Sequence, residues 1–374
     1  MSETSKAPPK VPPTGPGAPA GPFTAEDLAA RLGGDLEPAS EAEGARELMD
    51  VRGLADAGPE HLSFLSNRKY VRQLKTSKAG AVLIDRDTDA YGHTVIRLDD
   101  PYAAFARALE LFYPLEWPAP GVDPQAWVAP DAEVDGARIE AFAWVGPGAW
   151  VGRGSWIEAG AYVGPGARLG ERCRLMPGAV VCEGSWVGDR VWLNPGVVVG
   201  GEGFGFAPRK EGHLKIPQVG RAVIGDDVEI GANSCVDRAA MGDTAVRRGA
   251  KLDNLVQIGH GAEIGEGSLL AAFVGIAGST HIGRGVMMGG KSGAINHLTV
   301  GDGAQISTHS IAMGDQPAGA QVAGSPAIDR RKWLRATTVF AGLPELLQRV
   351  RTLEKRVAEL EGEREESSTE PSDD

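Results

Sequence analysis

The most regular feature of the chain is an aliphatic residue at every sixth position. Ten consecutive positions follow this spacing: Val145, Val151, Ile157, Val163, Leu169, Leu175, Val181, Val187, Leu193 and Val199. The same spacing resumes at Ile224, Ile230 and Val236, and again at Val246, Leu252, Ile258, Ile264, Leu270, Ile276, Ile282, Met288, Ala294, Val300 and Ile306. Three hexapeptides make an 18-residue coil in which each short strand points one aliphatic side chain inward. Residues 118–325 are therefore predicted to form a parallel β-helix, whose coils stack at roughly 4.8 Å.

Two insertions interrupt the repeat. The longer one runs from Gly200 to Gln218, which is too long for a coil corner, so we expect an external loop. Insertions of this kind often carry the binding function of a solenoid. The shorter one lies between Val236 and Val246 and contains Asp237.

The repeat is flanked by segments of a different character. Residues 1–22 hold seven prolines and predict a flexible leader. Residues 23–117 predict a small α/β domain, with helices at 24–32 and 101–112 and strands at 79–84 and 93–98.

Beyond the repeat, residues 326–362 predict helices. Within them a heptad-like stripe would bury one helical face in an oligomer, and it consists of Leu346, Val350, Leu353, Val357 and Leu360. The acidic residues 363–374 predict a disordered tail.

Composition excludes several classes of function. The formal net charge is −12, which argues against nucleic-acid binding, and no stretch is apolar enough to span a bilayer. The leader has no signal-peptide core. Three cysteines, Cys173, Cys182 and Cys235, have no CxxC spacing and predict neither a disulfide framework nor a thiolate zinc site. We therefore expect a protein of the reducing cytoplasm without a transmembrane segment.

Counting in coils identifies a candidate catalytic edge. Eighteen residues after His260 comes Gly278, and eighteen further comes Asn296, directly before His297. A base, a backbone N–H for an oxyanion and a second imidazole suit acyl transfer. Asp253 could orient the ring of His260.

Other interpretations of these histidines remain open. A histidine on a solenoid corner is more often solvated than catalytic. Some β-helix enzymes, such as a zinc-dependent carbonic anhydrase, bind zinc with histidines from adjacent coils at a trimer interface. Here the candidates would be His260, His281 and His297, although His281 lies off the column. A non-catalytic scaffold is a third possibility.

Several motifs, spread over three predicted domains, carry a specific resemblance. They are Leu62-Ser-Phe-Leu-Ser-Asn-Arg-Lys-Tyr70, Gly203-Phe-Gly-Phe206, Lys215-Ile-Pro-Gln-Val-Gly220, Gly231-Ala-Asn-Ser-Cys-Val-Asp-Arg238, Leu252-Asp-Asn-Leu-Val-Gln-Ile-Gly-His260, Ile276-Ala-Gly-Ser-Thr-His-Ile-Gly283, Gly324-Ser-Pro-Ala327 and Trp333-Leu-Arg335. Together they resemble the UDP-3-O-(3-hydroxyacyl)glucosamine N-acyltransferases, hexapeptide-repeat enzymes of lipid A biosynthesis. The resemblance covers residues ~23 to 360 and, like known hexapeptide-repeat proteins, implies the left-handed sense of the β-helix against the usual crossover rule.

The resemblance also implies roles for individual residues. His260 would be the general base that deprotonates the glucosamine 2-amine, paired with Asp253, while the N–H of Gly278 would hold the oxyanion. His297 would contact the pantetheine or acyl end of the donor. The implied uridine-binding residues are Phe64, Asn67 and Tyr70, and the implied limits of acyl-chain length are Ile311 and Met313. Phe64 could instead be a core residue, and Ile311 and Met313 could be ordinary packing.

The resemblance also implies the partners: no bound cofactor or metal, a 4′-phosphopantetheine that arrives on an acyl carrier protein, and a UDP-sugar as the other substrate. A solenoid edge alone is too shallow to bury both substrates, so we expect a homotrimer with each active site between neighbouring chains. We expect direct transfer because no Cys or Ser accompanies the histidine edge as an activated nucleophile. The O-acylating enzyme of the pathway is disfavoured by the extra N-terminal domain. Independently, the helical segment carries eight basic residues that suit an acidic carrier protein, namely Arg330, Arg331, Lys332, Arg335, Arg349, Arg351, Lys355 and Arg356. A solvated amphipathic face explains them equally well.

Three positions depart from the pattern of the family. They are Gly261 in place of asparagine, Glu202 in place of aspartate and Asn296 in place of glycine. Gly261 and Asn296 would alter contacts at the catalytic edge.

Overall fold

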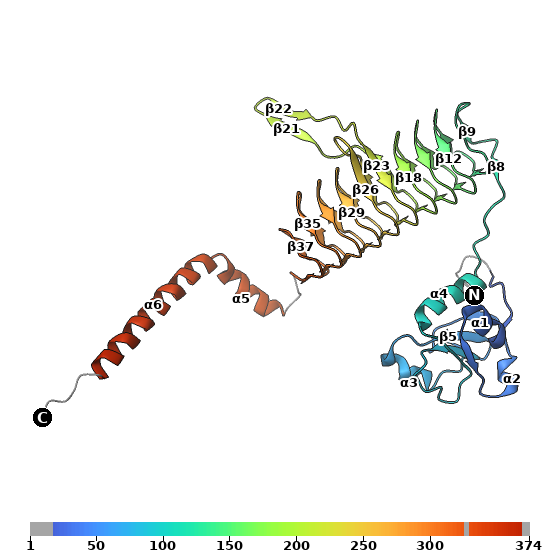
Figure 1. Ribbon diagram of the computed structural model, residues 1–374, viewed down its shortest axis with the longest axis horizontal. Helices are drawn as coiled ribbons and strands as arrows, with labels where there is room; N and C mark the ends of the chain where they lie inside the picture. Colours follow the sequence, from blue (N-terminus) through green and yellow to red (C-terminus); the bar gives the residue numbers. More distant parts are fainter. Residues whose placement is uncertain (1–17, 325–328, 369–374) are drawn as a thin grey trace, which may run out of the picture. The chain divides into compact units, whose positions relative to one another are not determined.

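The computed structural model describes residues 18–324 and 329–368 (Figure 1). The chain divides into two compact units, of which the first ends at Trp117 and the second begins at Pro118. Each unit is described by itself below.

The first unit is a small α/β domain. Its five-stranded sheet has the order β2 (Asp35–Glu37), β7 (Val95–Arg97), β6 (Ala81–Ile84), β5 (His61–Phe64), β4 (Asp50–Val51), and only the β2–β7 pair is antiparallel. A separate antiparallel pair joins β1 (Phe23–Thr24) to β3 (Glu47–Leu48). The helical elements are α1 (Ala25–Leu32), α2 (Glu41–Gly44), a 3₁₀ turn (Arg68–Tyr70), α3 (Val71–Leu74) and α4 (Pro101–Phe112).

The local signals in this unit act as expected. Thr24 caps α1 in a capping box with Asp27, and Gly33 ends the helix in a left-handed conformation. Asp100 caps α4, which carries proline in its first turn.

The predicted flexible leader is too long, because the backbone N–H of Ala20 donates to the carbonyl of Phe112 and thereby attaches the chain to the domain. Residues 1–17 lie outside the described part.

The second unit contains the predicted parallel β-helix, built from three parallel sheets. The ten-stranded sheet consists of β9 (Trp127–Val128), β11 (Trp144–Val145), β14 (Tyr162–Val163), β17 (Val180–Val181), β20 (Val198–Gly201), β25 (Cys235–Asp237), β28 (Gln257–Ile258), β31 (Gly275–Ile276), β34 (Gly293–Ala294) and β37 (Ile311–Ala312). The eight-stranded sheet consists of β12 (Trp150–Val151), β15 (Arg168–Leu169), β18 (Trp186–Val187), β23 (Arg221–Ile224), β26 (Asp243–Val246), β29 (Glu263–Ile264), β32 (His281–Ile282) and β35 (Thr299–Val300).

The eleven-stranded sheet completes the prism. Its strands are β8 (Gly121–Val122), β10 (Arg138–Ile139), β13 (Trp156–Ile157), β16 (Arg174–Leu175), β19 (Trp192–Leu193), β24 (Glu229–Ile230), β27 (Lys251–Leu252), β30 (Leu269–Leu270), β33 (Met287–Met288), β36 (Gln305–Ile306) and β38 (Gln321–Val322). Figure 1 shows the coils stacked in sequence order.

The aliphatic residues of the hexapeptide repeat form the core of this unit. Every repeat position from Val145 to Ile306 named above is buried. Paired strands are offset by one coil, so Val145 is registered with Val163, and Ile258 with Ile276. This burial, repeated in every coil, is the principal stabilisation of the solenoid.

The longer insertion leaves the prism as an antiparallel hairpin. Strands β21 (Phe206–Arg209) and β22 (Gly212–Lys215) pair with each other and project from the coils (Figure 1). The parallel ladder continues past the insertion, because Val187 pairs with Ile224.

Two helices follow the solenoid, α5 (Arg330–Phe340) and α6 (Leu343–Ser368). The five stripe residues on α6 are exposed. Part of the predicted disordered tail is helical, since α6 continues to Ser368. The residues after Gly362 are mainly Glu and Arg, which are strong helix formers and favour continuation of the helix. Residues 369–374, and residues 325–327 of the Gly324-Ser-Pro-Ala327 motif, lie outside the described residues.

Candidate active site

His260 lies in a pocket beside the hairpin insertion. It follows β28, an interior strand of the ten-stranded sheet, and is half-buried. The pocket has a volume of about 730 Å³, and its lining includes the insertion residues Glu202 to Phe204 together with Asp237, Gln257 and Gly278. The site therefore combines residues from neighbouring coils with an external loop.

Gly278 packs directly against the ring of His260. A Cβ atom on Gly278 would lie only 2.7 Å from Nε2 of His260, and 3.0 and 3.1 Å from its Cε1 and Cδ2 atoms. Within the described part of the chain, the N–H of Gly278 has no hydrogen-bond acceptor. An imidazole and an available backbone donor thus lie together, at the spacing of one coil.

His297 occupies a neighbouring row of the prism. Gly261, Ser279 and His297 lie on successive corners, and all three have positive φ. Backbone hydrogen bonds join these corners: the N–H of Ser279 donates to the His260 carbonyl at 2.9 Å. The N–H of His297 donates to the Gly278 carbonyl at 3.4 Å. The His297 side chain is exposed. Its imidazole is therefore available to a bound molecule.

The insertion passes close over His260. A Cβ on Gly203 would lie 2.8 Å from the Cβ of His260, so only glycine allows the loop to approach this closely. Glu202 forms an ion pair with Lys215 across the base of the hairpin. Beside them Phe204, 84% exposed, packs edge-on against Phe206 at a ring-centroid distance of 5.2 Å. The loop thus adds an apolar wall to a polar pocket.

Asp237 shares the pocket with His260 and interacts with its charge. Burial raises the pKa of Asp237, while a hydrogen bond from Gln257 and the charge of His260 act in the opposite direction. Sequence reasoning missed this residue because the shorter insertion breaks the 18-residue count between the two coils. The signal that would have found it is strand pairing, which registers Val236 with Ile258 and so places Asp237 one rung from the strand that leads to His260.

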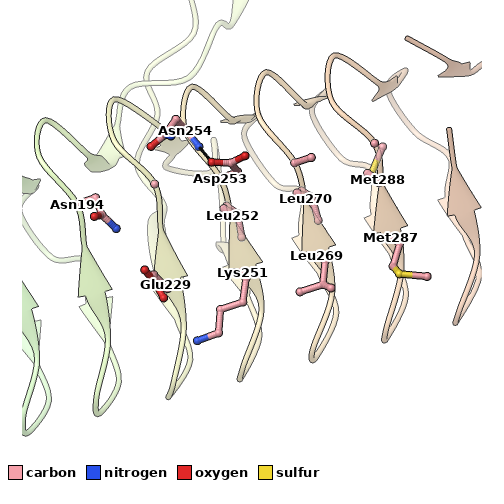
Figure 2. A pocket seen from close by; sticks show the side chains of 13 residues that line it. Asn194, Glu229, Lys251, Leu252, Asp253, Asn254, Leu269, Leu270, Met287 and Met288 are labelled. Atoms are coloured by element: carbon pink, nitrogen blue, oxygen red, sulfur yellow. Dashed lines mark hydrogen bonds between the residues drawn. The ribbon is translucent and has the colours of Figure 1, made fainter. Parts of the chain in front are cut away.

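Asp253 is not brought to His260 within one chain. It follows β27 on the eleven-stranded sheet, where its carboxylate accepts the N–H groups of Asn254 at 2.7 Å and Ala272 at 3.0 Å. Figure 2 shows it beside Asn254 and above Leu252, in the lining of a second pocket. The proposed pairing with His260 is therefore corrected for a single chain: the carboxylate lies on a different sheet and is held by backbone amides.

Within one chain, the three histidines of the zinc interpretation do not converge. His281 lies on the eight-stranded sheet, with its Nε2 atom 3.5 Å from Glu263. Among the described residues, no group of three His, Cys, Asp or Glu side chains could hold a metal ion.

The positions that depart from the family pattern all have local partners or a place in a pocket. The N–H of Gly261 donates to the Thr244 hydroxyl at 2.8 Å. Glu202 makes the ion pair with Lys215, and Asn296 lines a further pocket on the ten-stranded sheet.

The implied uridine segment lies in the first unit. Tyr70 is 52% exposed and Asn67 is exposed, with its side chain capping the N–H of Lys69 at 3.0 Å. Phe64 is half-buried and stacks on Phe105 of α4 at 3.8 Å. One face of the Phe64 ring thus packs in the domain, as the core interpretation expects, while the side chain stays partly exposed.

The two residues expected to limit acyl-chain length lie near the end of the ten-stranded sheet. Ile311 belongs to β37 and Met313 follows it, and both are exposed.

No helix of the described ranges is both long and apolar enough to cross a membrane.

Comparison with known proteins decides the family. The family model described as UDP-3-O-(3-hydroxymyristoyl) glucosamine N-acyltransferase, LpxD, matches residues 45–111, and a bacterial transferase hexapeptide model matches residues 148–183. The UDP-3-O-acylglucosamine N-acyltransferase of Anaeromyxobacter dehalogenans is 44% identical over 364 residues, covering 90% of this chain and 97% of that protein. The chain belongs to this family. Family members of the same name from Syntrophus aciditrophicus (44% identity, 83% of this chain and 86% of that protein) and Porphyromonas gingivalis (40%, 90% and 97%) are similarly close.

Proposed function

We propose that this enzyme transfers a 3-hydroxyacyl chain from acyl carrier protein to the 2-amine of UDP-3-O-(3-hydroxyacyl)glucosamine in lipid A biosynthesis. Membership of the N-acyltransferase family supports the reaction class. The observation that carries the mechanism is the packing of Gly278 against Nε2 of His260 inside a pocket bordered by an external loop.

The chemistry is a direct transfer. His260 removes a proton from the amine as its nitrogen attacks the thioester carbon, and the N–H of Gly278 donates to the oxyanion that forms. The C–S bond then breaks, and the proton held by His260 passes to the leaving pantetheine thiolate. The product is the 2,3-diacylated UDP-sugar and the free carrier thiol.

Cysteine chemistry supports the absence of an acyl-enzyme. Burial raises the pKa of Cys173 to about 12, and it also raises those of Cys182 and Cys235. A thiolate nucleophile is therefore disfavoured at neutral pH in all three cases.

Two carboxylates support His260 in this proposal. Asp237 stabilises the imidazolium from within the chain. Asp253 lies on another sheet of the prism, so it can reach His260 only from a neighbouring chain, as in the homotrimer that we propose. The exposed aliphatic stripe of α6 is a second surface that such an assembly would cover.

The donor and the sugar use the remaining predicted residues. The eight basic residues of α5 and α6 are exposed and suit an acidic carrier protein in the cytoplasm. The exposed His297 is available to the pantetheine, and Tyr70, Asn67 and Phe64 to the uridine.

A reconstitution with defined substrates tests the function. Purified protein is given the 3-O-acylated UDP-glucosamine with a 3-hydroxyacyl chain on either acyl carrier protein or coenzyme A, and N-acylated product is measured by mass spectrometry. We expect turnover with the carrier-protein donor and a loss of 10²–10⁴-fold in kcat for His260→Ala. The matched control is His281→Ala, on another sheet, with activity like that of the wild type. Full activity of His260→Ala would refute the proposed base, and stronger turnover with coenzyme A would refute the carrier-protein donor.

A further inference from the structure

A buried glutamine supports the loop that passes over His260. Gln218 stands at the end of the longer insertion, is only 5% exposed and does not itself line the His260 pocket. Its Oε1 atom and the Cβ atom of His260 both lie against the vacant Cβ position of Gly203, at 3.2 and 2.8 Å respectively. The three residues therefore meet at one point of the loop.

The same amide group fills the space beside Gly205. A Cβ on Gly205 would lie 2.6 Å from Nε2 of Gln218. This nitrogen donates to the carbonyl of Ile216 at 3.0 Å, and the N–H of Ile216 in turn donates to the carbonyl of Gly205 at 2.9 Å. The loop from Gly203 to Gly205 is thus folded over a single amide, which only glycine allows without a shift at either position.

One polar atom of this amide has no partner. Because only the nitrogen can donate to the Ile216 carbonyl, the orientation of the amide is fixed, and Oε1 is left buried with no donor among the described residues. Gly203 is also buried, and its N–H has no acceptor within the same part of the chain. A hydrogen bond between the two is favoured, because a buried polar group without a partner is costly.

His260 is held between this loop and the prism. Its Cβ and Cγ atoms lie 2.8 and 3.3 Å from the Cβ position of Gly203, and its Nε2 atom lies 2.7 Å from that of Gly278. Gly278 follows β31 and is fixed by the parallel ladder, whereas Gly203 stands in a loop outside the ladder. What supports Gly203 therefore also supports the orientation of the imidazole.

We propose that Gln218 is a positioning residue: its Oε1 accepts a hydrogen bond from the N–H of Gly203 when the substrates bind, and the loop then keeps the ring of His260 aligned with the acceptor amine. The inference rests on the proposed function, because it needs His260 as the base. Misplacement of a base by about 1 Å costs roughly 100-fold in rate. Loss of the support should lower kcat and leave the KM for the UDP-sugar nearly unchanged, since Gln218 does not line the pocket.

The substitution Gln218→Met tests this role, because it removes both polar atoms of the amide and keeps the length of the side chain. We expect kcat to fall roughly 10- to 100-fold in the N-acylation assay, with the KM for the UDP-sugar within about twofold of the wild-type value. The matched control is Gln316→Met. Nε2 of Gln316 also donates to the carbonyl two residues earlier, that of Gly314, at 2.8 Å, but away from the His260 pocket, so its kcat should be that of the wild type.

Double variants separate positioning from a structural role. Gln218→Met should cause no further loss in a His260→Ala background, and combined with Gly203→Ala it should be about as slow as the slower single variant. Thermal melting establishes that the variants fold. If Gln218→Met does not fold, Gly203→Ala carries the test alone: its φ is not positive, its Cβ separates the loop from both partners, and a wild-type kcat would overturn the proposal.

The outcomes distinguish the two proposals. Wild-type protein without turnover, or full activity of His260→Ala, overturns the proposed function. A wild-type kcat in folded Gln218→Met, a rise in KM alone, or an equal further loss in the His260→Ala background overturns the role of Gln218 and leaves the function in place.

Discussion

Replacing Gly278 by alanine should displace the ring of His260, our proposed base, without unfolding the solenoid. The added methyl carbon would lie 2.7 Å from Nε2 of His260, whereas ordinary contact begins at 3.4 Å, so the ring must move by about 0.7 Å. The φ of Gly278 is not positive, so the backbone accepts alanine. Displacement on this scale costs about 100-fold in rate when a base must be aligned for attack, equivalent to ~2.7 kcal/mol in the activation free energy.

The assay is steady-state N-acylation with saturating acceptor, followed through release of the carrier thiol. Gly290→Ala is the matched control, because Gly290 is also a solenoid corner glycine without a positive φ, but its Cβ would be 3.5 Å from the nearest atom. We expect the control to retain wild-type kcat and both variants to melt like the parent. A Gly278→Ala enzyme with more than half the wild-type kcat would refute the argument from ring displacement.

Two further predictions concern the carboxylate and the uridine site. Asp237→Asn should lower kcat yet raise the melting temperature at pH 7. Because the pKa of Asp237 is raised in the folded state, the stability of the wild type falls as pH rises through that pKa. Scanning calorimetry over pH should show that the difference in melting temperature between variant and wild type vanishes below pH 3.8, the ordinary pKa of the group. An unchanged melting temperature at pH 7 would contradict the burial of an ionised carboxylate. Tyr70→Ala should raise the KM for the UDP-sugar by about 5- to 150-fold through loss of stacking, while Tyr91→Ala in the same domain leaves it unchanged; equal KM values would remove Tyr70 from the site.

The solenoid could be predicted from sequence because one inward residue per hexapeptide is a strong and repeated signal. The same counting brought His260 and Gly278 together, since no insertion separates their coils. It failed for Asp237, where the insertion before Val246 changes the spacing between paired strands. It also failed for Asp253, because its seven-residue separation from His260 crosses from one sheet of the prism to another. The left-handed sense and the identity of both substrates came from resemblance alone, since neither depends on periodicity.

The hairpin insertion shows how this architecture separates stability from catalysis. The parallel ladder is complete on both sides of it, from Val187 to Ile224, so the loop adds a wall to the pocket without removing a buried residue from the core. Corners of the prism can therefore gain or lose segments while the stack of coils persists. For this family, changes in substrate preference can arise by altering loops and outward positions, independently of the aliphatic column that makes the protein fold.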